Sequence, residues 1–175
     1  MRRLAVAVAV AVAAGLLLPG CGYSLVGTGK GTLPEEVRSV WVPAFVNDTP
    51  VVGMEQRLTT AVLHELSARG RLKPAPSLEQ ADSLLTGRIT GYSLQPVRFD
   101  SQGRALEYQV MINARLTLTD RKSGKTLFDD PAFLFRQPYT VPVTDSSYFN
   151  PELLAIDRMS QPFARSVVST ILEGF

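Results

Sequence analysis

Two residues of types that commonly perform nucleophilic or metal-binding chemistry occur once each in this chain, Cys21 and His64. A nucleophilic site needs a base and an orienting partner beside the nucleophile, and a zinc site needs several suitably spaced ligands. His64 falls on the polar side of a predicted helix, and no paired-histidine or His-x-Glu spacing accompanies it. The acidic pairs Glu35-Glu36 and Asp129-Asp130 are adjacent residues, which point to opposite faces of a strand. The sequence therefore predicts that the protein is not an enzyme and holds no metal.

The position of Cys21 indicates a different chemistry. Arg2 and Arg3 form a short basic head, and residues 4–18 contain only Leu, Ala, Val and Gly. This apolar run is shorter than the about 20 residues of a membrane-spanning helix and is typical of an export signal. It ends in Leu18-Pro19-Gly20-Cys21, which resembles the bacterial lipoprotein box. We therefore predict that residues 1–20 are a cleaved signal peptide and that Cys21 becomes the mature amino terminus.

A single cysteine cannot form an intramolecular disulfide. Lipidation would instead convert the only thiol of an exported chain into a thioether. The alternative is an incidental thiol. The lipoprotein resemblance implies a diacylglyceryl group on the sulfur of Cys21 and an acyl chain on its amino group, and several chains anchor a protein more stably than one. Residue 22 is Gly and not Asp, which by analogy with Gram-negative sorting favours the periplasmic side of the outer membrane. We expect no cofactor besides this covalent lipid.

Cleavage before Cys21 changes the charge of the chain. The whole sequence has 18 Lys and Arg against 16 Asp and Glu, and the loss of Arg2 and Arg3 leaves 16 against 16. Residues 57–125 hold 11 basic and 6 acidic side chains, an excess that suits an anionic ligand but is too diffuse to indicate nucleic-acid binding. The mature length suits one domain. We divide the chain into a Gly-rich lipidated tether at 21–34 and a single domain at 35–175.

The elements that must position these residues follow from the hydrophobic pattern. Residues 37–46 are rich in β-branched and aromatic side chains and apolar on nearly both faces, which predicts a covered strand. Residues 51–68 predict a helix. Its apolar stripe consists of Val51, Met54, Leu58, Val62 and Leu66. Residues 81–94 predict a second long strand, and a loop that carries Arg104 follows it.

The clearest signal lies in residues 106–120, where the alternate positions from Leu106 to Leu118 are apolar and those between them mostly polar. This alternation predicts a strand with one buried face, roughly 50 Å long at about 3.3 Å per residue. Residues 121–125 form a turn, 126–129 begin a return strand, and 133–136 continue it. A helix follows from Asn150, with a kink or break near Ser160 caused by Pro162. The predicted fold is α+β, with two helices packed on one face of a mostly antiparallel sheet of about four strands.

Several segments resemble one protein family, in order along the chain. They are CGYSL after the signal, VWVPAFVNDT before the first helix, SARGRL after it, ADSLLTGRI, LEYQVMINARLTLTD and the closing LLAIDRMSQPFARSVVSTIL. Their order behind a lipoprotein cysteine resembles the LptE family of lipopolysaccharide-assembly lipoproteins over essentially the whole mature chain. The resemblance implies two helices packed against a mostly antiparallel sheet of about four strands, in agreement with the pattern-based prediction.

The resemblance implies an outer-membrane lipoprotein that sits as a plug inside the LptD β-barrel, helps the barrel assemble and binds lipopolysaccharide on its way to the cell surface. Arginine binds the phosphates of this ligand well, through its planar fork of donors. The family places ligand contacts near the loop before the long strand and beyond the hairpin. The candidates are Arg98, Arg104, Arg115 and Arg136, and the alternative is that they are ordinary solvated charges.

A rival function has the same sequence signs. A periplasmic auxiliary lipoprotein of another envelope lipid-trafficking ABC transport system would share the signal, the Gly-rich lead-in and a small α+β body. Co-purification separates the two functions, because the first predicts a large β-barrel as the partner and the second predicts inner-membrane ATPase components.

Overall fold

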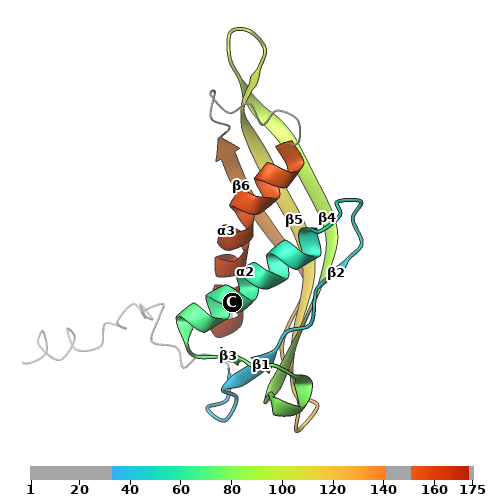
Figure 1. The fold of residues 1–175 in the computed structure, drawn as a ribbon, viewed down its shortest axis with the longest axis vertical. Coiled ribbons are helices and arrows are strands. Elements are labelled where there is room, and N and C mark those ends of the chain that lie inside the picture. Colours follow the sequence, from blue (N-terminus) through green and yellow to red (C-terminus); the bar gives the residue numbers. More distant parts are fainter. Residues whose placement is uncertain (1–32, 141–150, 174–175) are drawn as a thin grey trace, which may run out of the picture.

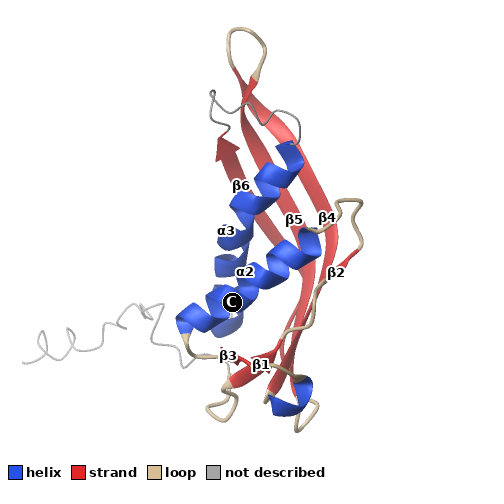
Figure 2. Ribbon diagram, in the orientation of Figure 1, coloured by secondary structure: helices blue, strands red, loops and turns tan. Residues whose placement is uncertain are grey.

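The computed structural model describes residues 33–140 and 151–173, which form one sheet and two long helices (Figure 1, Figure 2). Cys21, the predicted signal peptide and nearly all of the predicted tether lie outside the described residues. The strands are β1 (Ser39–Trp41), β2 (Val46–Asn47), β3 (Lys73–Pro74), β4 (Ser83–Phe99), β5 (Ala105–Asp120) and β6 (Thr126–Thr140). The helices are α2 (Met54–Arg69) and α3 (Pro151–Glu173), with a short 3-10 helix, η1, at Leu78–Gln80.

Three long strands form the body of the sheet, because β4, β5 and β6 pair antiparallel along most of their length. The order across the sheet is β3-β1-β4-β5-β6, and β2 also pairs with β4. The three short strands pair in parallel with their neighbours. The predicted α+β class is confirmed. The described sheet has six strands where about four were expected, because three of them are only two or three residues long.

β5 contributes a continuous row of buried side chains to the core. Its inward-facing side chains from Val110 to Leu118 are fully buried, and the side chains between them are partly or fully exposed. The four stripe residues of α2 from Met54 to Leu66 are buried as predicted. Nearer the β4–β5 hairpin, Leu106 and Tyr108 are only half-buried. The alternation in the sequence therefore predicted the buried face of this strand correctly.

The prediction of one continuous strand over residues 37–46 is wrong. β1 and β2 both pair with β4, at Val40↔Ser83 and Val46↔Arg88. Between these pairs the first segment has one residue more than β4, and Pro43 lacks the N–H that a ladder needs. The segment therefore leaves the sheet after Trp41 and returns with its side chains facing the other way. As a result, Val40 is fully buried, whereas Val46 is 45% exposed.

Of the kink or break predicted near Ser160, the break does not occur, because α3 is continuous from Pro151 to Glu173 with Pro162 inside it. The kink stays a prediction. Phe163 is fully buried, and its ring lies edge-on to Phe133 and Phe135 of β6, with centroids 5.8 and 5.7 Å apart. The hydroxyl of buried Ser160 donates a hydrogen bond to the carbonyl oxygen of Ile156 at 2.6 Å. Packing on both sides of the proline holds the helix together where local chemistry favours a break.

Two long strand edges have no neighbouring strand within the described ranges. β6 pairs only with β5, and β4 has no outer partner beyond Ile89. Pro131 and Pro138 lie in β6, and Pro96 lies in the far part of β4. Register shifts occur beside Pro96 and opposite Pro131. Because proline lacks an N–H and irregular register bends an edge, these features hinder pairing with a further strand.

At Gly87, β4 lies in close contact with the segment before α2. It is buried, and a Cβ placed on it would lie 2.6 Å from Cδ1 of Phe45. Phe45 has little freedom to move, because it is only 3% exposed and its backbone N–H donates to the Thr59 hydroxyl of α2 at 3.0 Å. Any side chain at position 87 would therefore displace the Phe45 ring.

We expect Gly87→Ala to lower the free energy of unfolding by about 1–3 kcal/mol, the usual range for overpacking a core. Urea unfolding followed by circular dichroism measures this loss. Gly91→Ala is the matched control, since its Cβ would come closest to the end of the exposed Asn113 side chain, at 3.0 Å from Nδ2. Adding Phe45→Leu to Gly87→Ala should recover part of the loss. Equal losses in the two alanine variants would contradict the packing argument.

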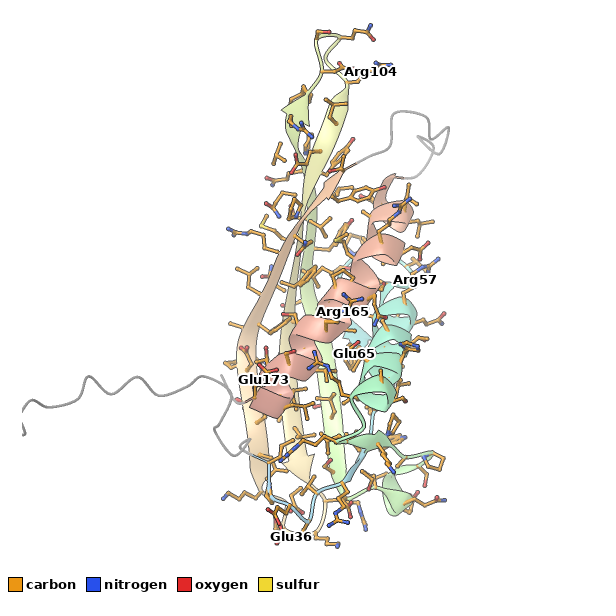
Figure 3. All side chains as sticks on the ribbon, turned by 90° about the vertical axis from the view of Figure 1, so that its left-hand side faces the viewer. Glu36, Arg57, Glu65, Arg104, Arg165 and Glu173 are labelled. Carbon is orange, nitrogen blue, oxygen red and sulfur yellow. The ribbon has the colours of Figure 1, made fainter. Side chains whose placement is uncertain are left out.

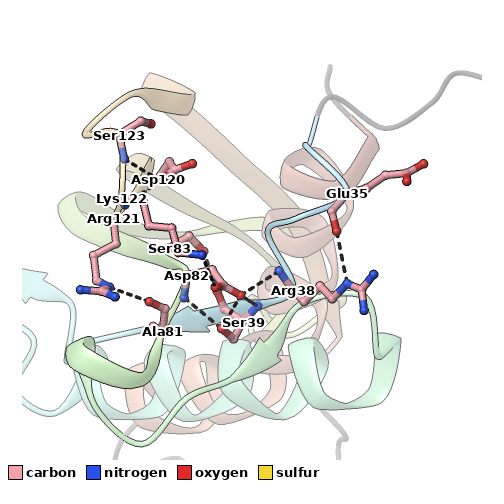
Figure 4. Close-up of polar contacts among 10 residues, drawn as sticks. All are labelled: Glu35, Arg38, Ser39, Ala81, Asp82, Ser83, Asp120, Arg121, Lys122 and Ser123. Atoms are coloured by element: carbon pink, nitrogen blue, oxygen red, sulfur yellow. Dashed lines mark hydrogen bonds and ion pairs between the residues drawn. The ribbon is translucent and has the colours of Figure 1, made fainter.

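Asp82 fastens β1 to the beginning of β4 (Figure 4). Its Oδ2 accepts hydrogen bonds from the Ser39 hydroxyl at 2.8 Å and from the backbone N–H groups of Ser39 and Arg38 at 3.1 and 3.2 Å. In return, the hydroxyl oxygen of Ser39 accepts the backbone N–H of Asp82 at 2.9 Å. The Ser39 hydroxyl, followed by the Arg38 N–H, lowers the pKa of Asp82 below its ordinary value.

This lowered pKa makes the stability of the fold depend on pH. Ionised Asp82 stabilises the folded chain above about pH 4, the ordinary carboxyl pKa, and this contribution is lost as the pH falls through the folded-state pKa. We expect Asp82→Asn to be less stable than the wild-type protein at pH 7. This difference in stability should become smaller below about pH 4. Thermal unfolding over this pH range tests it, with Ser39→Ala as the companion variant. A gap of constant size at all pH values would show that ionisation of Asp82 has no part.

Candidate functional site

The described residues contain no assembled metal-binding group. No three His, Cys, Asp or Glu side chains among them lie close enough to hold an ion. His64 is exposed on α2, as predicted, and lines an open groove of about 480 Å³ between α2 and α3. Arg57 and Asp157 line the same groove and pair with each other at 2.5 Å. Of the described helices, none is both long and apolar enough to cross a membrane.

The sheet presents one face to the two helices and the opposite face to its surroundings (Figure 3). We call the face opposite the helices the outer face. Its side chains on the long strands are those that alternate with the buried ones. They include Arg88 and Arg98 of β4, Glu107, Met111, Asn113, Arg115 and Thr117 of β5, and Asp129, Leu134 and Arg136 of β6. No described helix covers this face, so its charges are available to a ligand or partner.

Arg98 and Arg104 lie at the far end of the β4–β5 hairpin, which extends past the helices (Figure 1, Figure 3). Arg98 Nε is 3.1 Å from Glu107 Oε2, and Arg104 Nε is 2.7 Å from Asp100 Oδ2. Both arginine side chains remain more than half exposed, at 58% and 52%. The backbone N–H of Arg104, followed by its side chain, lowers the pKa of Asp100. These ion pairs hold the arginines in place and leave much of each guanidinium accessible.

The same hairpin end exposes apolar side chains. Val97 and Phe99 flank Arg98 in the sequence and are 54% and 56% exposed. Large apolar side chains that stay exposed together commonly mark a binding surface. This end of the hairpin therefore combines guanidinium and hydrophobic groups, which suits an amphipathic ligand.

Arg136 and Arg115 lie farther along the outer face. Arg136 is opposite Met111, whereas Arg98 is opposite Glu107, so the two levels are four residues, or about 14 Å, apart along β5. Arg115 lies another four residues along the same strand. Neither Arg115 nor Arg136 has an ion-pair partner in the described part of the chain. The structure thus brings Arg98 and Arg104 to one place and spreads Arg136 and Arg115 along the face.

Arg88 is a neighbour of Arg115 that the sequence analysis did not identify. The β4–β5 register places the two arginines directly opposite each other. Together with Val46, Thr86, Gly87 and Thr117 they line a shallow hollow of about 300 Å³. Alternation along each strand indicates that both side chains project from the outer face. Only the pairing between the strands shows that they lie opposite each other.

The fold and these surfaces define a small α+β domain whose distinctive feature is an uncovered sheet face that carries arginines. Solved structures with similar folds include a hypothetical protein from Chlamydia trachomatis, with a TM-score of 0.52 at 10% identity over 79% of this chain and 97% of that one. A protein from Xanthomonas campestris has a TM-score of 0.53 at 14% identity, over 81% of this chain and 88% of that one. At these identities the likeness establishes the fold alone.

The sequence model of the LptE family, described as lipopolysaccharide-assembly, matches residues 37–171. The chain belongs to this family, and the predicted resemblance is confirmed. Rare lipoprotein B from Shewanella oneidensis is a more distant structural neighbour, with a TM-score of 0.47 at 11% identity over 77% of this chain and 93% of that one. No curated protein matches the sequence significantly.

Proposed function

We propose that this protein is a non-catalytic outer-membrane lipoprotein, anchored through lipidated Cys21, that plugs an LptD-like β-barrel and assists its assembly. In this role it also binds lipopolysaccharide during delivery to the cell surface. Membership of the LptE family supports a role in lipopolysaccharide assembly and favours this function over that of an ABC-transporter lipoprotein. The observation that carries the proposal is the long β4–β5 hairpin, which extends past the helices with an arginine-bearing outer face.

The length of the sheet suits a plug. β5 has 16 residues and therefore spans about 54 Å at about 3.4 Å per residue. This length exceeds the about 30 Å hydrocarbon core of a bilayer, so a domain standing upright in a barrel would reach through the whole membrane. A polar outer face suits the polar interior of a barrel.

The two ends of the domain suit different contacts. The described chain begins at Leu33, whose carbonyl oxygen accepts a hydrogen bond at 3.1 Å from Arg71, two residues before β3. β1 and β3 lie at the end of the domain opposite the β4–β5 hairpin (Figure 1). The predicted Gly-rich tether has 11 residues between Cys21 and Leu33, and a Gly-rich linker of that length has an average span of about 18 Å. The lipid anchor would therefore hold the β1 end near the periplasmic leaflet, and the hairpin would point away from it.

The hairpin end supports the ligand part of the proposal. Lipopolysaccharide carries phosphates on a sugar backbone together with acyl chains. Arg98 and Arg104 offer guanidinium donors for the phosphates, and Val97 and Phe99 offer apolar contact. Arg136 lies one level farther along the same face, whereas Arg115 lies eight residues along β5 from the level of Arg98, outside this surface.

Cys21→Ala should abolish the lipid anchor, because a thioether can form only on the sulfur. We expect no palmitate incorporation and a loss of the protein from the outer-membrane fraction. Ser24→Ala, three residues along the tether, is the matched control and should keep both properties. A Cys21→Ala variant that still incorporates palmitate and fractionates with the outer membrane would overturn the assignment.

Changing Arg98, Arg104 and Arg136 together to Glu should reduce lipopolysaccharide binding at moderate salt by tenfold or more, on the order of one lost charge-assisted contact. The reversed charges would repel Glu107 and Asp100, so a triple Gln variant is measured beside it. The matched control reverses three exposed cations outside the β4–β5 hairpin end, Arg158 and Arg165 of α3 and Lys125 of the β5–β6 turn. Barrel co-purification and thermal unfolding of each variant show whether the fold is intact. Unchanged lipopolysaccharide binding in both hairpin variants would exclude this site.

A further inference from the structure

The Arg88–Arg115 pair is an unfavourable arrangement for the free protein. Like charges directly opposite each other in an antiparallel sheet destabilise it. Arg88 is compensated, because its Nη1 donates to both carboxylate oxygens of Asp48 at 2.7 and 3.1 Å. Arg115 is exposed and has no ion-pair partner in the described ranges. The guanidinium of Arg115 therefore carries a positive charge that no described carboxylate pairs with directly.

The walls of the hollow around this pair limit what it can hold. The Thr86 hydroxyl donates to the carbonyl oxygen of Thr117 at 3.4 Å, and the Thr117 hydroxyl donates to Asp129 Oδ1 at 2.8 Å. Both hydroxyl protons are thus engaged, so the guanidinium groups are the remaining strong donors. Val46 adds an apolar wall that is 45% exposed. The occupant should therefore accept hydrogen bonds at one end and be apolar behind it.

The charges beside the hollow favour a monoanion over a phosphate. Asp48 forms an ion pair with Arg88, and Asp129 accepts a hydrogen bond from Thr117. Both carboxylates would repel a group with two negative charges more strongly than a group with one. One uncompensated guanidinium matches one negative charge. The hollow also lies eight residues along β5, or about 27 Å, from the level of Arg98. It is therefore separate from the lipopolysaccharide surface proposed at the hairpin end.

We infer that this hollow receives one Asp or Glu side chain from the inner wall of the barrel. The carboxylate would lie between the guanidinium groups of Arg88 and Arg115, and its methylene groups would lie against Val46. This inference rests on the proposed barrel partnership and identifies the part of the outer face that docks. A like-charge pair that is unfavourable in the free protein becomes favourable when a carboxylate joins it.

Arg115→Gln separates docking from folding, because the two roles predict opposite effects. Removing the like-charge contact should leave the melting temperature of the free protein unchanged or raise it. The same change should weaken association with the barrel by about tenfold, the usual size of one lost charge-assisted contact. Arg115→Lys keeps the charge without the planar fork of donors, so its affinity for the barrel should lie between those of the wild-type chain and Arg115→Gln.

The test co-expresses the full lipidated chain with the LptD-like barrel of the same organism and measures the detergent-extracted complex by competition against wild-type protein. Arg165→Gln is the matched control, since Arg165 is an exposed arginine of α3 on the helix side (Figure 3). A photo-crosslinking residue at Thr117 leaves both arginines in place and should capture a barrel segment that contains an acidic residue.

The outcomes separate the inference from the function on which it rests. If the wild-type chain fails to co-purify with the barrel, the proposed function is wrong and the inference falls with it. If the wild-type chain binds and Arg115→Gln binds equally well, the inference alone is wrong. It is also wrong if Arg115→Gln lowers the melting temperature along with binding, or if the crosslink captures lipopolysaccharide. Weaker binding with an unchanged or higher melting temperature supports it.

Discussion

The pleat of β5 assigns its side chains to opposite faces of the sheet along 16 residues, and the pairing with β4 and β6 fixes which face is buried. A slip of one residue would place Leu116 in the surroundings and Arg115 in the core. The cost of burying an unpaired guanidinium makes such a slip very unfavourable. Both helices depend on this choice, because their apolar stripes have only one face of the sheet on which to pack. No described helix packs on the outer face, so core packing does not constrain its side chains and they are available to a partner or ligand.

Much of this arrangement could be predicted from local sequence, for identifiable reasons. Strand alternation depends only on neighbouring residues, so the buried face of β5 followed from its pattern. The helical stripe of α2 and the exposure of His64 followed in the same way. Asparagine commonly closes turns, and the Asn47 side chain hydrogen-bonds the backbone of Thr49 and Val51 after β2. The family also followed from the order of the segments.

The features that could not be predicted depend on contacts between distant segments. α3 continues through Pro162 because Phe163 packs on β6, which no local rule contains. Glu65 is buried although it is charged, since Arg69 and Gln161 hydrogen-bond its two carboxylate oxygens, and Gln161 lies 96 residues away. The split of the first predicted strand reflects a one-residue mismatch with β4. The candidate arginines were found singly, but their spacing and the meeting of Arg88 with Arg115 required the strand register.

The prolines along the uncovered edges affect how free copies of the chain associate with one another. Long edges with free N–H and C=O groups are templates on which further copies add, as in cross-β aggregates. Pro131 and Pro138 remove donors from β6, and Pro96 with its register shift does the same for the far part of β4. Free copies of the chain therefore resist edge-to-edge association through these strands. In the proposed role, the cell could keep a standing supply of this chain at the membrane, so that barrel folding would not have to be synchronised with its export.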